Sequence, residues 1–258
     1  LGLGYVGLNA PDASAWESFG VEAVGLMPAR SQPPGHEDDG TVFLKMDERL
    51  YRIAVHPSKE MGLGYMGFEL AGPTELEAAI EEVHNSGVAI DRGSESDAQA
   101  RGVAELAFFR DPMGNRVELF YGQSADYNFQ SPANVRAFKT GNLGMGHCLL
   151  LVPDIRQATS FYMSVLGFRL SDFTAGGKIQ FLHCTPRHHT LALAELGGAN
   201  GIHHVMLEME DLDDVGRALD RAKVQGAPIT ADLGRHTNDQ AVSFYAGSPS
   251  EMSVEVGW

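Results

Sequence analysis

Cysteine is almost absent from this chain of 258 residues. The only two, Cys148 and Cys184, stand in apolar runs. Two cysteines are too few for the disulfide framework on which small secreted domains depend. We therefore expect free, buried thiols and a cytoplasmic protein.

Basic residues are also scarce, because 19 Lys and Arg stand against 34 Asp and Glu, which gives a net charge of −15. This balance argues against nucleic acid and against an anionic membrane surface as partners. The sequence contains no apolar run long enough to span a bilayer. We accordingly expect no membrane association and no signal peptide.

Apolar residues and histidines are plentiful. Hydrophobic residues make up 43% of the chain, which predicts a packed core, and 258 residues suffice for one large or two small domains. Seven of the ten histidines follow residue 140. The second half is thus the part of the chain that is rich in potential metal ligands and acid–base groups.

An internal repeat organises the sequence. The segment LGYVGLNAPDASAWESFGVEAVGL has the same pattern as MGHCLLLVPDIRQATSFYMSVLGF. Asp12 corresponds to Asp154 and Gly25 to Gly167, both 142 residues apart. Each segment predicts a strand, a helix capped by aspartate and a glycine stop.

The repeat extends through the rest of both halves. Residues 64–90 parallel 203–229 at an offset of 139, and residues 111–122 parallel 248–258 at an offset of 137. We interpret the chain as two homologous modules, 1–135 and 136–258, joined near the polar segment 123–140. Each module should hold two strand–helix–strands units, an α+β arrangement whose sheet leaves one face free as a cup for a ligand.

The C-terminal stretch LGRHTNDQAVSFYAGSPSEMSVEVGW predicts a hairpin with Glu255 in its last, apolar strand. A carboxylate in such a strand is costly unless a cation meets it. When the modules are superimposed, His147, His204 and Glu255 take the positions of the following residues of the first module: Tyr5, Tyr65 and Glu118. Two imidazoles and one carboxylate form the facial triad of non-haem Fe(II) oxygenases.

Simpler interpretations of the histidines remain. A lone histidine in an apolar strand is usually a packed core residue, but the shared register of all three residues favours metal ligation. Because His203 and His204 are adjacent on a strand, they should point to opposite faces. Register with Tyr65 selects His204, whereas His203 either lines the substrate pocket or is an ordinary polar residue.

Several segments together carry a family resemblance: GMGHCLLLVPD, FYMSVLGFRLSD, FLHCTPRHHTLAL, IHHVMLE, GRHTNDQAVSFY and VEVGW. With these segments, nearly the whole chain resembles the type I extradiol ring-cleaving dioxygenases, and within them the two-domain enzymes that act on bicyclic catechols. The resemblance implies the vicinal oxygen chelate fold of βαβββ units. One departure is the segment 171–180, which is shorter than we expect for the family.

The resemblance also implies residue roles. His147, His204 and Glu255 match the iron ligands, and His189 matches the acid–base histidine. Alternation along an expected strand, rather than the resemblance, predicts that the neighbouring His188 points away. The groups expected beside the catechol oxygens are His236, Tyr245, Asn238 and Asp239, although Asp239 is equally well explained as a turn or cap residue. The expected pocket walls are Phe181, His203, Leu149 and Met206.

The implied reaction needs a catechol that chelates Fe(II) through both oxygens, and O₂ as the second substrate. Family resemblance also predicts a homo-oligomer. Two alternatives compete with this function. A metal-dependent glyoxalase or epimerase-type isomerase would draw ligands from two modules, but Tyr5 and Tyr65 leave the first with too few. A non-enzymatic binding protein would not need His189, His236 and Tyr245 around an open iron site.

Overall fold

The structure, a computed structural model, describes residues 1–37 and 39–258. Within them the chain forms two eight-stranded sheets, one from each half. The first has the order β2–β3–β4–β1–β5–β8–β7–β6. Its strands are β1 (Gly2–Ala10), β2 (Met27–Pro28), β3 (Val42–Lys45), β4 (Ile53–Pro57), β5 (Gly62–Glu69), β6 (Asp91–Arg92), β7 (Glu105–Arg110) and β8 (Arg116–Tyr121).

The second sheet repeats this order as β10–β11–β12–β9–β13–β16–β15–β14. Its strands are β9 (His147–Leu151), β10 (Arg169–Thr174), β11 (Ile179–His183), β12 (Leu191–Ala194), β13 (Gly201–Glu208), β14 (Ile229–Arg235), β15 (Val242–Gly247) and β16 (Ser253–Gly257). The expected hairpin is therefore present as β15 and β16, which pair antiparallel with Tyr245 opposite Glu255. The short segment 171–180 lies in the hairpin of β10 and β11.

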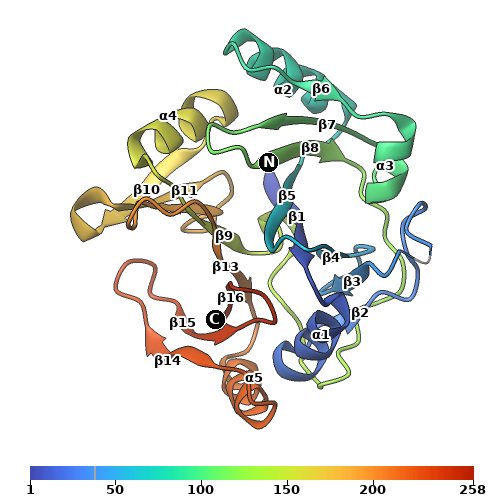
Figure 1. Cartoon of the computed structure of the whole chain (residues 1–258), viewed down its shortest axis with the longest axis vertical. Coiled ribbons are helices and arrows are strands. Elements are labelled where there is room, and N and C mark those ends of the chain that lie inside the picture. Colours follow the sequence, from blue (N-terminus) through green and yellow to red (C-terminus); the bar gives the residue numbers. More distant parts are fainter. Residues whose placement is uncertain (38) are drawn as a thin grey trace.

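Helices separate the strands in the pattern that the repeat predicts. The helices are α1 (Ala13–Ser18), which continues as the π-helical turn η1 (Phe19–Val24), α2 (Pro73–Asn85), α3 (Glu95–Arg101), α4 (Ile155–Leu166) and α5 (Leu212–Val224). Two short 3₁₀ turns complete the set, η2 (Gly141–Leu143) and η3 (Ala175–Gly177). Figure 1 shows two curved sheets with α2, α4 and α5 at the periphery. The α+β class and the two modules of paired βαβββ units are confirmed, with α3 as an addition to the first module.

Local chemistry explains the first helix of each module. The Asp12 carboxylate accepts a hydrogen bond from the Ala15 amide, and Asp154 caps α4 in the same way. Gly25 and Gly167 end these helical segments with φ angles of 94° and 67°, a left-handed conformation that favours glycine. The predicted caps and stops are therefore confirmed in both modules.

Reciprocal contacts join the two modules. Trp16 of α1 donates from its indole nitrogen to Ser250 Oγ at 2.8 Å, and Tyr162 of α4 donates from its hydroxyl to Asp111 Oδ2 at 2.6 Å. Both contacts are buried, and each runs from a helix of one module to the turn before the last strand of the other. The helices thus fix the position of each sheet relative to its neighbour.

Two smaller expectations concern cysteines and membranes. Both cysteines are free, but Cys184 is only partly buried, unlike Cys148. Among residues 1–37 and 39–258, no helix has the length and apolar character needed to cross a membrane.

Side chains fill the cup of the first sheet. The Tyr5 ring stacks on Phe120 with centroids 4.5 Å apart and lies 5.8 Å from the Tyr65 ring. The Glu118 side chain is fully buried and accepts a hydrogen bond from the Tyr5 hydroxyl at 2.7 Å. His56 completes this polar cluster, because its Nε2 lies 2.9 Å from the Tyr65 hydroxyl oxygen.

This cluster predicts a pH dependence of stability. Burial, reinforced by the Arg101 guanidinium, lowers the pKa of His56 to about 4. Because an unfolded histidine titrates near 6.5, the unfolded chain binds this proton more readily than the folded one. The contribution of neutral His56 to the unfolding free energy is therefore complete above pH 6.5 and is lost as the pH falls towards 4. Chemical denaturation at several pH values should therefore give His56→Gln a shallower loss of unfolding free energy, by up to about 1.4 kcal/mol per pH unit.

The matched control is His84→Gln, because His84 is exposed on α2. Its unfolding free energy should follow the wild-type pH dependence between 6.5 and 4. A His56→Gln variant with the same slope as the wild type would contradict the prediction.

Candidate metal centre

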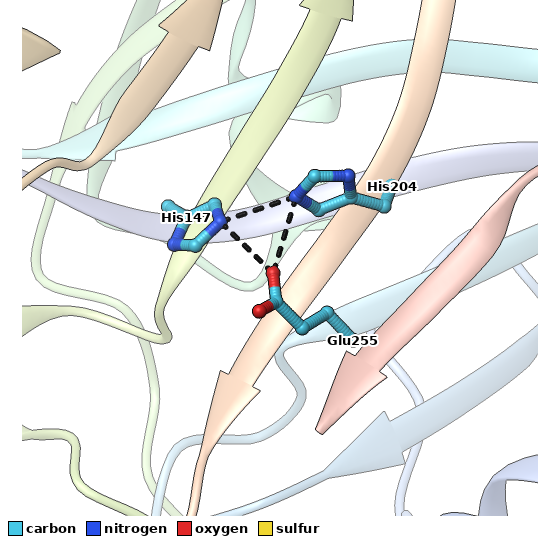
Figure 2. Close-up of side chains that lie close together, drawn as sticks. All are labelled: His147, His204 and Glu255. Carbon is cyan, nitrogen blue, oxygen red and sulfur yellow. Dashed lines mark hydrogen bonds and ion pairs between the residues drawn. The ribbon is translucent and has the colours of Figure 1, made fainter. Parts of the chain in front are cut away.

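Three adjacent strands of the second sheet bring together His147, His204 and Glu255. His147 is the first residue of β9, His204 lies on β13 and Glu255 lies on β16, and β13 pairs with both other strands. Met206 of β13 is opposite His147 on one side and Glu255 on the other. The sheet register therefore sets the spacing of the three side chains, which Figure 2 shows pointing towards one another.

The donor atoms form a compact triangle. His147 Nε2 lies 3.2 Å from His204 Nε2 and 3.4 Å from Glu255 Oε2, and the third side of the triangle measures 3.3 Å. All three residues are buried, with 6%, 4% and 2% exposure. One metal ion about 2.0–2.2 Å from each donor fits this spacing, which is the usual range for imidazole nitrogen and carboxylate oxygen.

The protonation states also fit a cation. Burial lowers the pKa of His147, so its imidazole is neutral near pH 7. Burial alone would raise the pKa of Glu255, but hydrogen bonds from His147, His204 and His236 hold it well below its usual range. A neutral imidazole and an ionised carboxylate are the forms that bind a metal.

The other carboxylate oxygen of Glu255, Oε1, is held by neighbouring side chains. Ser243 donates its hydroxyl to Glu255 Oε1 at 2.6 Å, and His236 Nε2 lies 3.3 Å from the same oxygen. The Tyr245 hydroxyl lies 3.3 Å from His236 Nε2. Ser243 is a residue that the sequence argument missed, although strand alternation places it on the same face as Tyr245.

The expectation that His203 and His204 point to opposite faces is wrong. The β13–β9 pairing shifts register between Ile202 and His204, which leaves His203 as the extra residue of a β-bulge. The two side chains converge as a result, with their Nδ1 atoms 2.8 Å apart. With Nε2 of His204 directed at the metal position, a hydrogen bond at its Nδ1 helps to orient the ring.

His189 lies beside the triangle. Its ring centroid is 3.9 Å from that of His147, and its Nδ1 is 3.9 Å from Asp239 Oδ2. Burial, with His147 next in importance, lowers the pKa of His189 well below its usual value. The expectation that His188 points away is also wrong, because its Nδ1 lies 3.0 Å from that of His189. The pair lies in a bend before β12, where strand alternation does not apply.

A cavity of about 560 Å³ opens over the donor triangle. The expected site residues on its wall are His147, Leu149, Phe181, His189, His203, His204, His236, Asn238, Asp239, Tyr245 and Glu255. The expectation that Met206 forms a wall of this cavity is wrong. Met206 lies beyond the triangle and lines a neighbouring cavity of about 490 Å³ beside Trp258 and Lys139.

Asp239 combines both of the interpretations that the sequence left open. Its Oδ1 accepts a hydrogen bond from the Ala241 amide at 3.0 Å, as a turn residue would. Its Oδ2 faces His189 across 3.9 Å, at the edge of the same cavity. The side chain can therefore hold its own loop and face the site.

Comparison with known proteins agrees with this arrangement. A model of the glyoxalase/bleomycin resistance protein/dioxygenase superfamily matches residues 144–256, and a model of the dihydroxybiphenyl dioxygenase BphC D1 matches residues 3–58. The chain is 43% identical over 265 residues to the biphenyl-2,3-diol 1,2-dioxygenase of Metapseudomonas furukawaii, covering 99% of this chain and 85% of that relative.

Two further relatives are similar over the same extent. The iron-dependent extradiol dioxygenase of Rhodococcus jostii (strain RHA1) is 35% identical over 268 residues, covering 99% of this chain and 88% of the relative. The crystal structure of BphC, a halotolerant catechol dioxygenase, superimposes with a TM-score of 0.93 at 39% identity, covering 99% of this chain and 86% of that one.

Similarity of this degree spans both modules and includes the strands that carry the donor triangle. The superfamily match also agrees with the paired βαβββ units of the vicinal oxygen chelate fold. The chain therefore belongs to the extradiol ring-cleaving catechol dioxygenases of the glyoxalase/bleomycin resistance protein/dioxygenase superfamily.

Proposed function

We propose that this dioxygenase cleaves a bicyclic catechol, such as 2,3-dihydroxybiphenyl or 1,2-dihydroxynaphthalene, with Fe(II) held by His147, His204 and Glu255. The carrying observation is the buried His–His–carboxylate triangle in the wall of an open cavity. This donor set is the facial triad typical of non-haem Fe(II) oxygenases, and one relative is named as iron-dependent. When bound, iron would supply a Lewis acid for both catechol oxygens and a site for O₂.

The chain's own residues would handle protons and orientation. His189 is neutral because of its burial, so its imidazole can accept a proton from an incoming catechol hydroxyl. Hydrogen bonding to Glu255 raises the pKa of His236, which favours a positive imidazolium next to a catecholate oxygen. We assign Tyr245 and Asp239 to the positioning of the diol and of the two histidines. Tyr245 contacts His236, and Asp239 faces His189.

The cavity supports a two-ring substrate. Its volume of about 560 Å³ lies within the range of small-molecule sites, and its apolar wall includes Leu149, Ile179 and Phe181. We propose that these residues contact the distal ring, while His203 and Asn238 line the polar part of the wall. The relative from Metapseudomonas furukawaii is named for biphenyl-2,3-diol, a catechol of this size.

The isomerase alternative receives less support. Such an enzyme would take ligands from both modules, but the first module presents Tyr5 and Tyr65, and its Glu118 is already bonded to Arg101. We therefore propose that residues 136–258 form the catalytic module and that residues 1–135 form a metal-free one. The homo-oligomeric state and the cytoplasmic location stay predictions, for sedimentation velocity and cell fractionation to test.

The proposed reaction is tested with an oxygen electrode. Protein reconstituted with Fe(II) under anaerobic conditions should consume O₂ on addition of 2,3-dihydroxybiphenyl and form a yellow ring-opened product. Because the distal ring adds apolar contact, kcat/KM should exceed that for catechol by roughly tenfold or more. Phe181→Ala should narrow this ratio, and a preference for catechol over both bicyclic substrates would contradict the substrate assignment.

A second prediction separates metal binding from proton transfer. His189→Gln should keep its iron but lose roughly 10²–10⁴-fold in kcat, the usual contribution of a positioned proton-transfer group. His204→Gln should lose the iron itself. The measurements are iron content and single-turnover rate for each variant.

The matched control is His183→Gln, because His183 bonds to Ser171 and does not line the cavity over the donor triangle. This variant should retain its iron and most of the turnover. Loss of iron from His189→Gln would make His189 a ligand. An unchanged kcat in that variant would make it a packing residue.

A further inference from the structure

The first module has its own version of the donor triangle. Strands β1, β5 and β8 occupy the same places in their sheet as β9, β13 and β16 in the other. They carry Tyr5, Tyr65 and Glu118 at the repeat positions of the two histidines and Glu255. In both modules the buried carboxylate therefore lies at the same point of the same sheet.

A guanidinium meets the carboxylate of the first module. Arg101 donates from Nε to Glu118 Oε2 at 3.0 Å and from Nη2 to Oε1 at 3.1 Å. Its central carbon also lies 3.7 Å from the centroid of the Tyr65 ring. Arg101 thus contacts Glu118 and Tyr65 directly. It also shares Glu118 Oε2 with the hydroxyl of Tyr5, the third residue of the triangle.

The outer contacts of the two carboxylates also correspond. Glu255 Oε1 is held by Ser243 and His236, and its Oε2 faces the histidines. Glu118 Oε1 accepts from Arg116 Nε at 2.7 Å and from Arg101, while its Oε2 accepts from Tyr5 and Arg101. Arg116 therefore corresponds to the outer supports. Arg101 occupies the inner position, because it bonds to both oxygens of Glu118 and lies over the Tyr65 ring.

Arg101 comes from the one helix that the repeat does not share. It is the last residue of α3, which is capped by Ser94 and Asp97 and ends at Gly102. In the described structure α5 is followed only by β14, β15 and β16, so the second module has no corresponding helix. The added helix thus brings a cation into the first cup, while the second cup remains open.

We propose that the Arg101 guanidinium is the permanent cation of the first module, at the place where the second module binds its metal. A bidentate guanidinium neutralises the buried carboxylate and excludes a divalent ion by charge and volume. The first cup therefore keeps the carboxylate of a divalent-cation site, with tyrosines in place of the two imidazoles and Arg101 in place of the ion. The comparison rests on the proposed metal role of His147, His204 and Glu255. The test must therefore give a result even if those residues bind no metal.

The test measures Co²⁺ stoichiometry by equilibrium dialysis and by the visible absorption of the bound ion. Every variant carries Glu255→Gln, which disables the second-module site. Adding Tyr5→His and Tyr65→His should give no bound Co²⁺ while Arg101 is present. Adding Arg101→Ala as well should give one equivalent per chain.

The matched control replaces Arg101→Ala with Arg116→Ala, which removes the other guanidinium on Glu118. It should bind no Co²⁺, because Arg101 still occupies the inner position. Equal binding by the two variants, or binding with Arg101 intact, would overturn the proposal. A chain that has Glu255 but binds no Co²⁺ would count against the proposed function alone.

A single substitution covers the case in which the combined variants fail to fold. Arg101→Ala should lower the thermal midpoint more than Arg116→Ala does. Millimolar methylguanidinium should raise the midpoint of Arg101→Ala by a few degrees and leave that of Arg116→Ala unchanged. Absence of this selective rescue would show that the position does not bind a cation.

Discussion

A buried carboxylate in the last central strand is the constraint on which both modules depend. Glu118 and Glu255 lie at repeat positions, have at most 2% exposure and are flanked by apolar strand residues. An ionised carboxylate in such surroundings is costly without cationic or hydrogen-bonding partners. The polar groups around each carboxylate offset that cost.

The two modules meet the constraint in opposite ways. In the first, Glu118 is satisfied by side chains of the protein itself: Arg101, Arg116 and the Tyr5 hydroxyl. Aromatic rings fill the cup around it. In the second, three histidines and a serine surround Glu255, and a cavity stays open above them. The first carboxylate is thus balanced by cations of the chain itself, whereas the second faces an open cavity.

Sequence reasoning succeeded where the repeat applies. The offset of 142 residues placed the capping aspartates and stop glycines, and the register of three strands brought together His147, His204 and Glu255. It failed where the modules differ or where a strand is irregular. The bulge at His203 arises from pairing with β9, and alternation within a single strand carries no record of it.

Other omissions had a signal in the sequence. Ser94 and Asp97 have the spacing of a capping box, which could have revealed α3 and with it Arg101. Ser243 lies two residues before Tyr245 on a predicted strand, so its face was already known, but its contact with Glu255 required the register between β15 and β16. Long-range register is the information that a single sequence conveys least well.

The reciprocal packing of the modules links the first cup to the position of Glu255. Metal ligands must hold their geometry to within about half an ångström, and side chains on strands hold it better than side chains on loops. Here β16 follows a turn whose Ser250 accepts a hydrogen bond from Trp16 of the first module. The first module therefore contacts and supports the turn that precedes Glu255. Under the proposed function, the first module would contribute to the reaction through the position of one carboxylate, although none of the residues that line the cavity over the donor triangle belongs to it.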